Sequence, residues 1–143
     1  MGTDFINELQ TRAKAEPKRV VFPEANEEKI LRAARQVRDM GIAYPFLVGE
    51  PQAVSALAGS VGISLDGITV VDHTDEDKAE HFANEYVKTN PALPASAVKR
   101  MLKSPLYFGA MMVKLDEADC MVAGLSHTTG EVIMGSEMII GLQ

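Results

Sequence analysis

The chain has 143 residues, of which 46% are hydrophobic and 24% are charged. This composition is typical of a globular domain and excludes both a disordered chain and a membrane span. Acidic residues outnumber basic ones by 20 to 14, giving a net charge of −6, and no sustained basic block favours nucleic acid. We therefore expect neither a nucleic-acid nor a membrane partner. Any anionic ligand has to be held locally, by backbone N–H groups or a few side chains.

Cysteine usage and the N-terminus indicate the compartment. The single cysteine, Cys120, cannot form an internal disulfide, which favours a reducing environment. The first ten residues lack the charged and then apolar profile of a signal peptide, so we expect a cytoplasmic protein. Because Cys120 falls inside a short apolar run, we also expect a buried and unreactive thiol.

The first part of the chain alternates between helical and strand-like patterns. Apolar residues at helical spacing predict a helix over 3–15, and the run Val20–Phe22 predicts a strand that Pro23 closes. Asn26 is a candidate N-cap for the next helix, which extends to Met40. The elements expected after it are a strand over 44–49, a helix over 53–58, a strand over 68–71 and a helix capped by Thr74 or Asp75.

The second part continues the same alternation. The patterns predict helices over 95–103 and 104–115, a strand over 119–124 and a last helix over about 131–140. Strands that alternate with helices predict an α/β fold, specifically a three-layer αβα sandwich with a mainly parallel sheet. Such sheets bind ligands beyond the carboxyl ends of their strands. The segments expected there are 23–26, 49–51, 72–74 and 124–131.

The segment 124–131 is the most suggestive of these. It carries Ser126, His127, Thr128 and Thr129 in succession, just before the predicted last helix. Hydroxyl groups together with the free N–H groups of a helix N-terminus suit a phosphate or carboxylate oxygen. The alternative is that Thr128 or Thr129 only caps the helix and His127 is a surface residue. The pattern alone leaves both interpretations open.

Other kinds of site receive little support. The chain has neither G-x-x-x-x-G-K-[ST] nor G-x-G-x-x-G. Its three histidines, His73, His81 and His127, are far apart in sequence, so we predict no metal site. Glu24, in a cluster with two further acids after the first strand, is most simply part of a helix N-terminus.

Three collinear stretches carry a family resemblance. They are V-V-F-P-E-A-N-E-E-K-I-L-R-A-A from Val20, Y-F-G-A-M-M-V from Tyr107 and G-L-S-H-T-T from Gly124. The chain resembles the phosphate acetyltransferase family, which includes phosphate butyryltransferases, from about Pro17 to Gln143. The resemblance implies reversible acetyl transfer between acetyl phosphate and coenzyme A. Coenzyme A is then a substrate, and no cofactor or metal is expected; a butyryl-specific or other acyl-specific member is an alternative.

The resemblance also implies that residues 1–143 form an incomplete first α/β domain. Enzymes of the family are longer and have a second domain, and the site lies in the cleft between the two. We therefore expect this chain to be inactive alone, and we assign no catalytic residue to it. A further alternative is a non-catalytic binding or assembly module. Because the second domain is absent, apolar surface is expected to be exposed, and we predict a homo-oligomer.

Some site residues can be carried over position by position. The resemblance assigns substrate contacts to Ser126, His127, Thr128 and Thr129, to Glu24 and Asn26 after the first strand, and to Lys88, which aligns with a basic residue of the family. Met134 stands where the family has an arginine. Its thioether removes a cation suited to a forked contact with phosphate, so we expect altered substrate binding.

Overall fold

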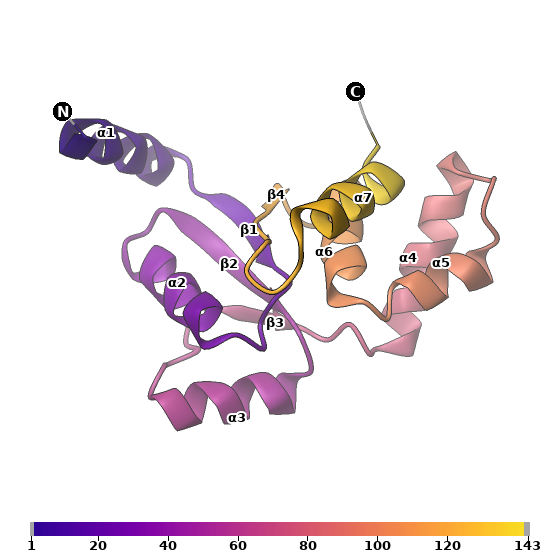
Figure 1. Cartoon of the computed structure of the whole chain (residues 1–143), viewed down its shortest axis with the longest axis horizontal. Coiled ribbons are helices and arrows are strands. Elements are labelled where there is room, and N and C mark those ends of the chain that lie inside the picture. The colour runs from indigo at the N-terminus through magenta and orange to yellow at the C-terminus, as the bar shows by residue number, and fades with distance from the viewer. Residues whose placement is uncertain (1, 142–143) are drawn as a thin grey trace.

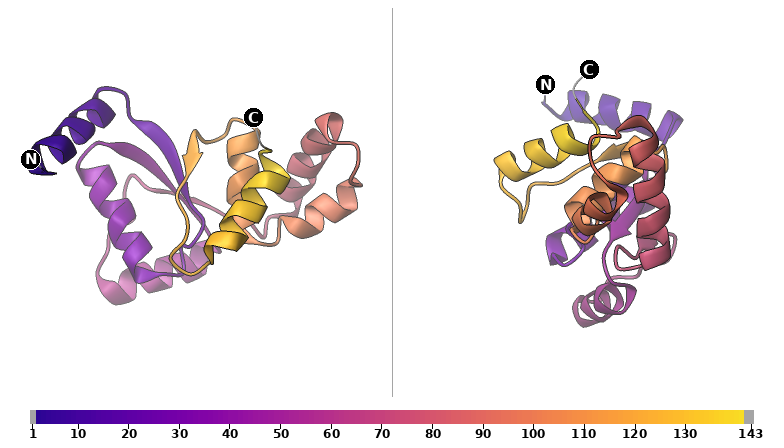
Figure 2. Two further views of the ribbon diagram at one scale, coloured as in Figure 1. Left: turned by 45° about the horizontal axis from the view of Figure 1, so that its top comes forward. Right: turned by 90° about the vertical axis from the view of Figure 1, so that its right-hand side faces the viewer.

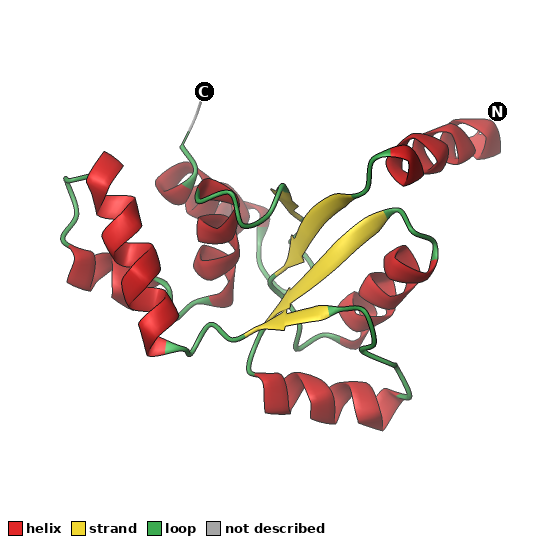
Figure 3. Cartoon of the chain, turned by 180° about the vertical axis from the view of Figure 1, so that it is seen from behind, coloured by secondary structure: helices red, strands yellow, loops and turns green. Residues whose placement is uncertain are grey.

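The computed structural model describes residues 2–141. Its centre is a sheet with the strand order β3-β2-β1-β4 (Figures 1 and 3). All three neighbouring pairs are parallel, which confirms the predicted parallel sheet. The strands are β1 (Lys18–Phe22), β2 (Ala43–Val48), β3 (Thr69–Val71) and β4 (Cys120–Met121).

Helices cover both faces of this sheet, as the three-layer prediction requires. Helices α2 and α3 pack on one face, and α6 packs on the other, with α4, α5 and α7 beside it (Figures 1 and 2). Helix α1 extends away from the sheet and buries no residue (Figure 1). The bounds are α1 (Gly2–Ala15), α2 (Glu28–Asp39), α3 (Pro51–Val61), α4 (Glu76–Thr89), α5 (Ala95–Met101), α6 (Pro105–Lys114) and α7 (Thr129–Ile139).

The core consists of two apolar clusters, one on each face of the sheet. Val21 belongs to the cluster with Phe82 and Phe108, whereas its neighbour Phe22 belongs to the cluster with Leu31. Successive strand residues point to opposite faces, so a strand covered on both sides needs a continuous apolar run. Full burial of each such side chain contributes roughly 1.5–3 kcal/mol.

The starts of two helices test the predicted caps. Asp75 caps α4, because its side chain accepts hydrogen bonds from the N–H groups of Asp77 and Lys78. The prediction that Asn26 caps α2 is wrong, since α2 begins at Glu28 and has Glu27 at the N-cap position. The chain makes a turn through Asn26 before the helix begins.

Strand β4 is shorter than the predicted strand over 119–124, and it lies at the edge of the sheet. Cys120 is therefore exposed, and the prediction of a buried thiol is wrong. In the part of the chain that the structure describes, β1 is the only strand that pairs with β4. Partial desolvation and the nearby Asp119 carboxylate raise the pKa of Cys120, so the thiol stays protonated at neutral pH.

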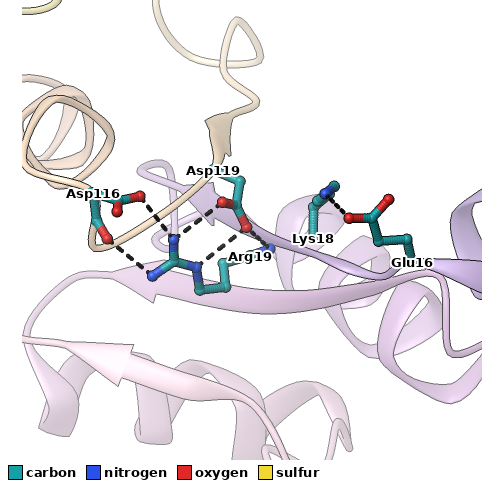
Figure 4. A network of polar contacts seen from close by, with 5 residues as sticks. All are labelled: Glu16, Lys18, Arg19, Asp116 and Asp119. Atoms are coloured by element: carbon teal, nitrogen blue, oxygen red, sulfur yellow. Dashed lines mark hydrogen bonds and ion pairs between the residues drawn. The ribbon is translucent and has the colours of Figure 1, made fainter.

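An ion-pair network joins the start of β1 to the turn before β4 (Figure 4). The Arg19 guanidinium contacts both carboxylate oxygens of Asp119, with Nε–Oδ2 at 3.2 Å and Nη2–Oδ1 at 3.1 Å. It also donates to the backbone carbonyl of Asp116, which has a left-handed backbone with φ of 61°. The network holds this turn against the sheet edge.

Candidate functional site

The sheet topology brings two distant loops together at the carboxyl ends of its strands. Because β1 and β4 are neighbours, the segment after β1 meets the segment 124–127 after β4. Glu24 lies between them and is 1% exposed. An acidic side chain is almost never buried this fully unless it is paired or hydrogen-bonded, so its partners define the site.

Those partners are the backbone N–H groups of four consecutive residues. The N–H groups of Gly124 and Leu125 donate to Oε1 of Glu24 at 2.8 and 3.1 Å. The N–H groups of Ser126 and His127 donate to Oε2, at 2.5 and 3.0 Å. Successive N–H groups that converge in this way form an anion-binding nest. In this chain the nest already holds the protein's own carboxylate.

The electrostatics of Glu24 follow from two opposing causes. Burial on its own raises the pKa of the carboxyl group, because it penalises the charged form. Hydrogen bonds from Ser126, Leu125 and Gly124 stabilise the charged form and outweigh burial. The pKa of Glu24 is held far below its usual range, and the group is a carboxylate at neutral pH.

Two side chains of the loop also bond to Glu24. The hydroxyl of Ser126 donates to Oε2 at 2.7 Å, and Nδ1 of His127 lies 3.1 Å from the same oxygen. A carboxylate only accepts hydrogen bonds, so the imidazole carries its proton on Nδ1 in the neutral form. Nε2 of His127 and the lone pairs of Ser126 Oγ are then left as acceptors.

The two threonines that follow have a different role. Thr128 caps α7 through a capping box, in which its hydroxyl accepts from the N–H of Glu131 and the Glu131 side chain accepts from the N–H of Thr128. The capping interpretation is therefore confirmed for Thr128. Thr129 is the exposed first residue of α7. The helix thus begins two residues before the predicted start at Glu131.

A cavity of about 640 Å³ opens beside this loop, at the carboxyl ends of β1 and β2. Its volume falls within the range of about 300–1,000 Å³ that is common for small-molecule sites. Ser126, His127 and Asn26 line it together with residues of α3. Its apolar walls come from Pro23, Ala25, Val48, Ala53, Val54, Leu57 and Pro105.

The structure brings together some of the predicted site residues and separates others. Asn26, Ser126 and His127 line the same cavity, and Glu24 holds Ser126 and His127 in place through hydrogen bonds. Lys88 lies at the far end of α4, pairs with Glu85 at 2.6 Å and does not line the cavity. The loop bearing Ser126 and His127 lies at the carboxyl ends of the strands, where we expected it.

Two further polar residues line the cavity. Glu50 precedes α3 and is exposed at the cavity. His73 lies in the segment after β3, and its Nδ1 is buried without a hydrogen-bond partner among the described residues. The rule that ligands bind at the carboxyl ends of strands already pointed to both segments, but nothing local singled out these side chains.

Residues 2–141 contain neither a metal-ligand cluster nor a membrane-spanning helix. Within them, no three His, Cys, Asp or Glu side chains are grouped as metal ligands. Likewise, none of the helices described there has the length and apolar character needed to cross a bilayer.

Comparison with known proteins decides the family. Residues 4–143 match the family model for phosphate acetyl/butaryl transferase. The chain belongs to this family. The phosphate acetyltransferase of Acetivibrio thermocellus is 33% identical over 138 residues, and that of Treponema pallidum is 34% identical over 140 residues. The matches cover 95% and 96% of this chain, but only 41% and 42% of the two relatives.

Solved structures of the phosphate acetyl/butaryl transferase family share the fold. A phosphotransacetylase from Streptococcus pyogenes superposes with a TM-score of 0.89 at 25% identity, covering 96% of this chain and 42% of that one. The EutD phosphotransacetylase from Staphylococcus aureus gives a TM-score of 0.88 at 26% identity, covering 99% and 43% of the two chains. This chain thus spans about two-fifths of the length of each of these four relatives.

Proposed function

We propose that this chain supplies one wall of an active site that transfers an acetyl group between acetyl phosphate and coenzyme A. The observation that carries the proposal is the loop of Ser126 and His127, held by Glu24 beside the cavity at the strand ends. Family membership supports acyl transfer as the reaction class. The other wall belongs to the remaining part of the longer enzymes, of which this chain spans about two-fifths.

The chemistry of the transfer explains why the wall is incomplete alone. A thiol with an ordinary pKa of about 8.5 is mostly protonated at neutral pH, so a base has to take its proton during attack on the acyl carbonyl. The charge that develops on the carbonyl oxygen and the leaving phosphate requires placed donors or cations. No Lys or Arg lines the cavity in the described part of the chain. We assign no catalytic residue here, and we propose that the reaction uses neither metal nor prosthetic group.

A fusion protein tests this proposal. Residues 1–143 are joined to the part of the Acetivibrio thermocellus enzyme that they do not match, and acetyl-CoA formation is measured. We expect turnover by the fusion and only background from the 143-residue chain. Butyryl phosphate in the same assay distinguishes an acetyl-specific from a butyryl-specific enzyme. A folded fusion that is inactive with both acyl phosphates contradicts the proposal and favours a non-catalytic module.

The exposed apolar side chains on α7 favour the association of this chain with a second copy of itself. Ile133, Met134 and Met138 are 52%, 58% and 45% exposed, and Leu125 beside the helix is 46% exposed. Exposed apolar side chains on one helix are typical of a protein interface, so we propose that two copies associate through this face. Light scattering after size-exclusion chromatography tests it: monomer at all micromolar concentrations contradicts the proposal. The cytoplasmic location stays a prediction.

A further inference from the structure

We infer that the cavity beside Ser126 and His127 binds an uncharged, hydrogen-bond-donating part of the substrate, and that it does not bind a phosphoryl group. For coenzyme A this part is the pantetheine arm, which has amide N–H groups, a hydroxyl and a terminal thiol. The inference rests on the proposed function, since it assigns one portion of that substrate to this wall. It differs from the expectation that the loop binds phosphate.

The first argument is the state of the backbone donors. A phosphate nest needs free N–H groups, but those of Gly124, Leu125, Ser126 and His127 all donate to Glu24. The next N–H along the chain, that of Thr128, donates to the Glu131 side chain at 2.8 Å. A phosphate could use this nest only by displacing a buried carboxylate, which would leave that charge without partners.

The second argument is the sign of the charge around the cavity. Within the described residues its ionisable lining groups are the carboxylate of Glu50 and the imidazoles of His73 and His127, and it includes neither Lys nor Arg. Glu24 adds a second negative charge directly behind the loop. Carboxylates repel a phosphate anion, whereas they do not disfavour a neutral group. The cavity is therefore a poor site for the phosphoryl end of either substrate.

The third argument is what the loop side chains can offer. The Ser126 hydroxyl donates its hydrogen bond to Glu24, and Nδ1 of His127 lies 3.1 Å from the same carboxylate, so the imidazole tautomer that donates there has no proton on Nε2. Both side chains are therefore left with acceptor atoms, Oγ and Nε2, for a ligand. Acceptors match amide N–H, hydroxyl and thiol S–H groups. The apolar wall formed by α3 residues such as Val54 and Leu57 suits the methylene and methyl groups between them.

Titrations of the ¹⁵N-labelled 143-residue chain followed by NMR test the inference. Pantetheine and inorganic phosphate are added separately at equal millimolar concentrations. We expect pantetheine to shift the amide signals of Gly49, Ala53, Leu57 and His127 with saturation, and phosphate to leave them unchanged. We also expect the His127 ring to show a protonated Nδ1 and an unprotonated Nε2, with the Nε2 signal moving when pantetheine binds.

A matched pair of variants locates the binding. Ala53 and Ala56 are both exposed on α3, but only Ala53 lines the cavity. Ala53→Trp is expected to weaken pantetheine binding at least tenfold, and Ala56→Trp to leave it within twofold of the parent chain. Equal losses in both variants, no saturable shift with pantetheine, or saturable shifts of the 124–127 amides with phosphate would each overturn the inference.

These outcomes are separate from the test of the proposed function. The NMR titration requires no acyl transfer, and the fusion assay does not depend on which group the cavity holds. An active fusion combined with phosphate bound at the loop refutes only the inference. Pantetheine bound to the 143-residue chain combined with an inactive, folded fusion refutes only the proposed function.

Discussion

Oε2 of Glu24 lies 3.1 Å from Nδ1 of His127, although the two residues are 103 positions apart in the chain. The contact joins the loop after β1 to the loop after β4, and it sets both the shape of the site and the proton position on the imidazole. The carboxylate also accepts hydrogen bonds from four backbone N–H groups. A substitution of Glu24 therefore affects all of the loop over 124–127.

Glu24→Gln is expected to loosen the loop without removing the fold. The amide is neutral, and its NH₂ group faces donors, so several hydrogen bonds to a charged acceptor weaken. We expect a loss of roughly 1–3 kcal/mol in the free energy of unfolding and faster amide hydrogen exchange at residues 124–127. Glu50→Gln, an exposed acid at the same cavity, is the control and is expected to change neither quantity. Unchanged exchange at 124–127 in Glu24→Gln would show that the carboxylate does not hold the loop.

The same residue predicts a pH dependence of stability. The pKa of Glu24 is lower in the folded than in the unfolded chain, where it is about 4.3. Its contribution is therefore present above that pH and is lost as the pH falls below it. Urea unfolding between neutral pH and pH of about 3 should show a shallower acid slope for Glu24→Gln. Asp119, whose pKa Arg19 lowers to about 2, also makes stability fall with pH in the acid range, so part of this dependence remains in both proteins. Parallel slopes would contradict the prediction.

Arg19→Met is expected to lower the thermal midpoint by releasing the turn before β4. The guanidinium bonds to Asp119 and to the Asp116 carbonyl, so its loss removes several contacts across the sheet edge at once. Lys18→Met is the matched control, because among residues 2–141 Lys18 pairs with the nearby exposed Glu16 alone (Figure 4), and such pairs contribute little. An equal shift in both variants would show that the Arg19 network adds no more than a surface ion pair.

Gly109→Ala tests how closely α6 packs on β1. A Cβ at this position would lie 2.9 Å from Cγ1 of Val21 and 3.1 Å from the sulfur of Met121. We expect a loss of roughly 1–3 kcal/mol in the free energy of unfolding, as for other overpacked cores. Gly59→Ala in α3, where nothing lies within 4 Å, should instead raise stability by roughly 0.5–1 kcal/mol. Chemical denaturation measures both. An unchanged free energy of unfolding in Gly109→Ala would mean that α6 can move away from β1 at little energetic cost.

Met134→Arg tests the departure from the family pattern. Met134 is 58% exposed on α7, so the longer side chain fits without disturbing the core. In the active fusion protein we expect a lower KM for a phosphate-bearing substrate, because a guanidinium can form a forked contact with phosphate. Met138→Arg, on the same helix and 45% exposed, controls for charge alone. The same KM in both variants would show that position 134 has no special relation to the substrate.

Much of the fold could be predicted from local pattern. Asp75 caps α4 as predicted, and Pro51 and Pro105 lie at the first positions of α3 and α6, because such preferences depend only on neighbouring residues. Two predictions failed where the outcome depended on distant neighbours. Asn26 does not cap α2, and Cys120 is exposed because β4 lies at the edge of the sheet.

In the candidate site, too, some residues could be predicted from local pattern, whereas others depend on contacts between distant parts of the chain. Ser126 and His127 could be singled out from the sequence, since polar residues that follow an apolar strand predict the ligand-binding edge of a parallel sheet. The local pattern around Glu24 instead favours a helix N-terminal acid, because the partners that it has in the structure lie about a hundred positions away. No local signal distinguishes an acid beside a helix from one that fills a distant nest.

By itself, the sequence determined the alternation of helices and strands, the apolar runs that require a covered sheet, and the family. Only the tertiary structure decided that β1 and β4 are neighbours and that the loop's N–H groups are already occupied by Glu24. The physical reason is that propensity and capping act over a few residues. Strand order and the burial of a carboxylate are instead set by the free energy of contacts between distant parts of the chain.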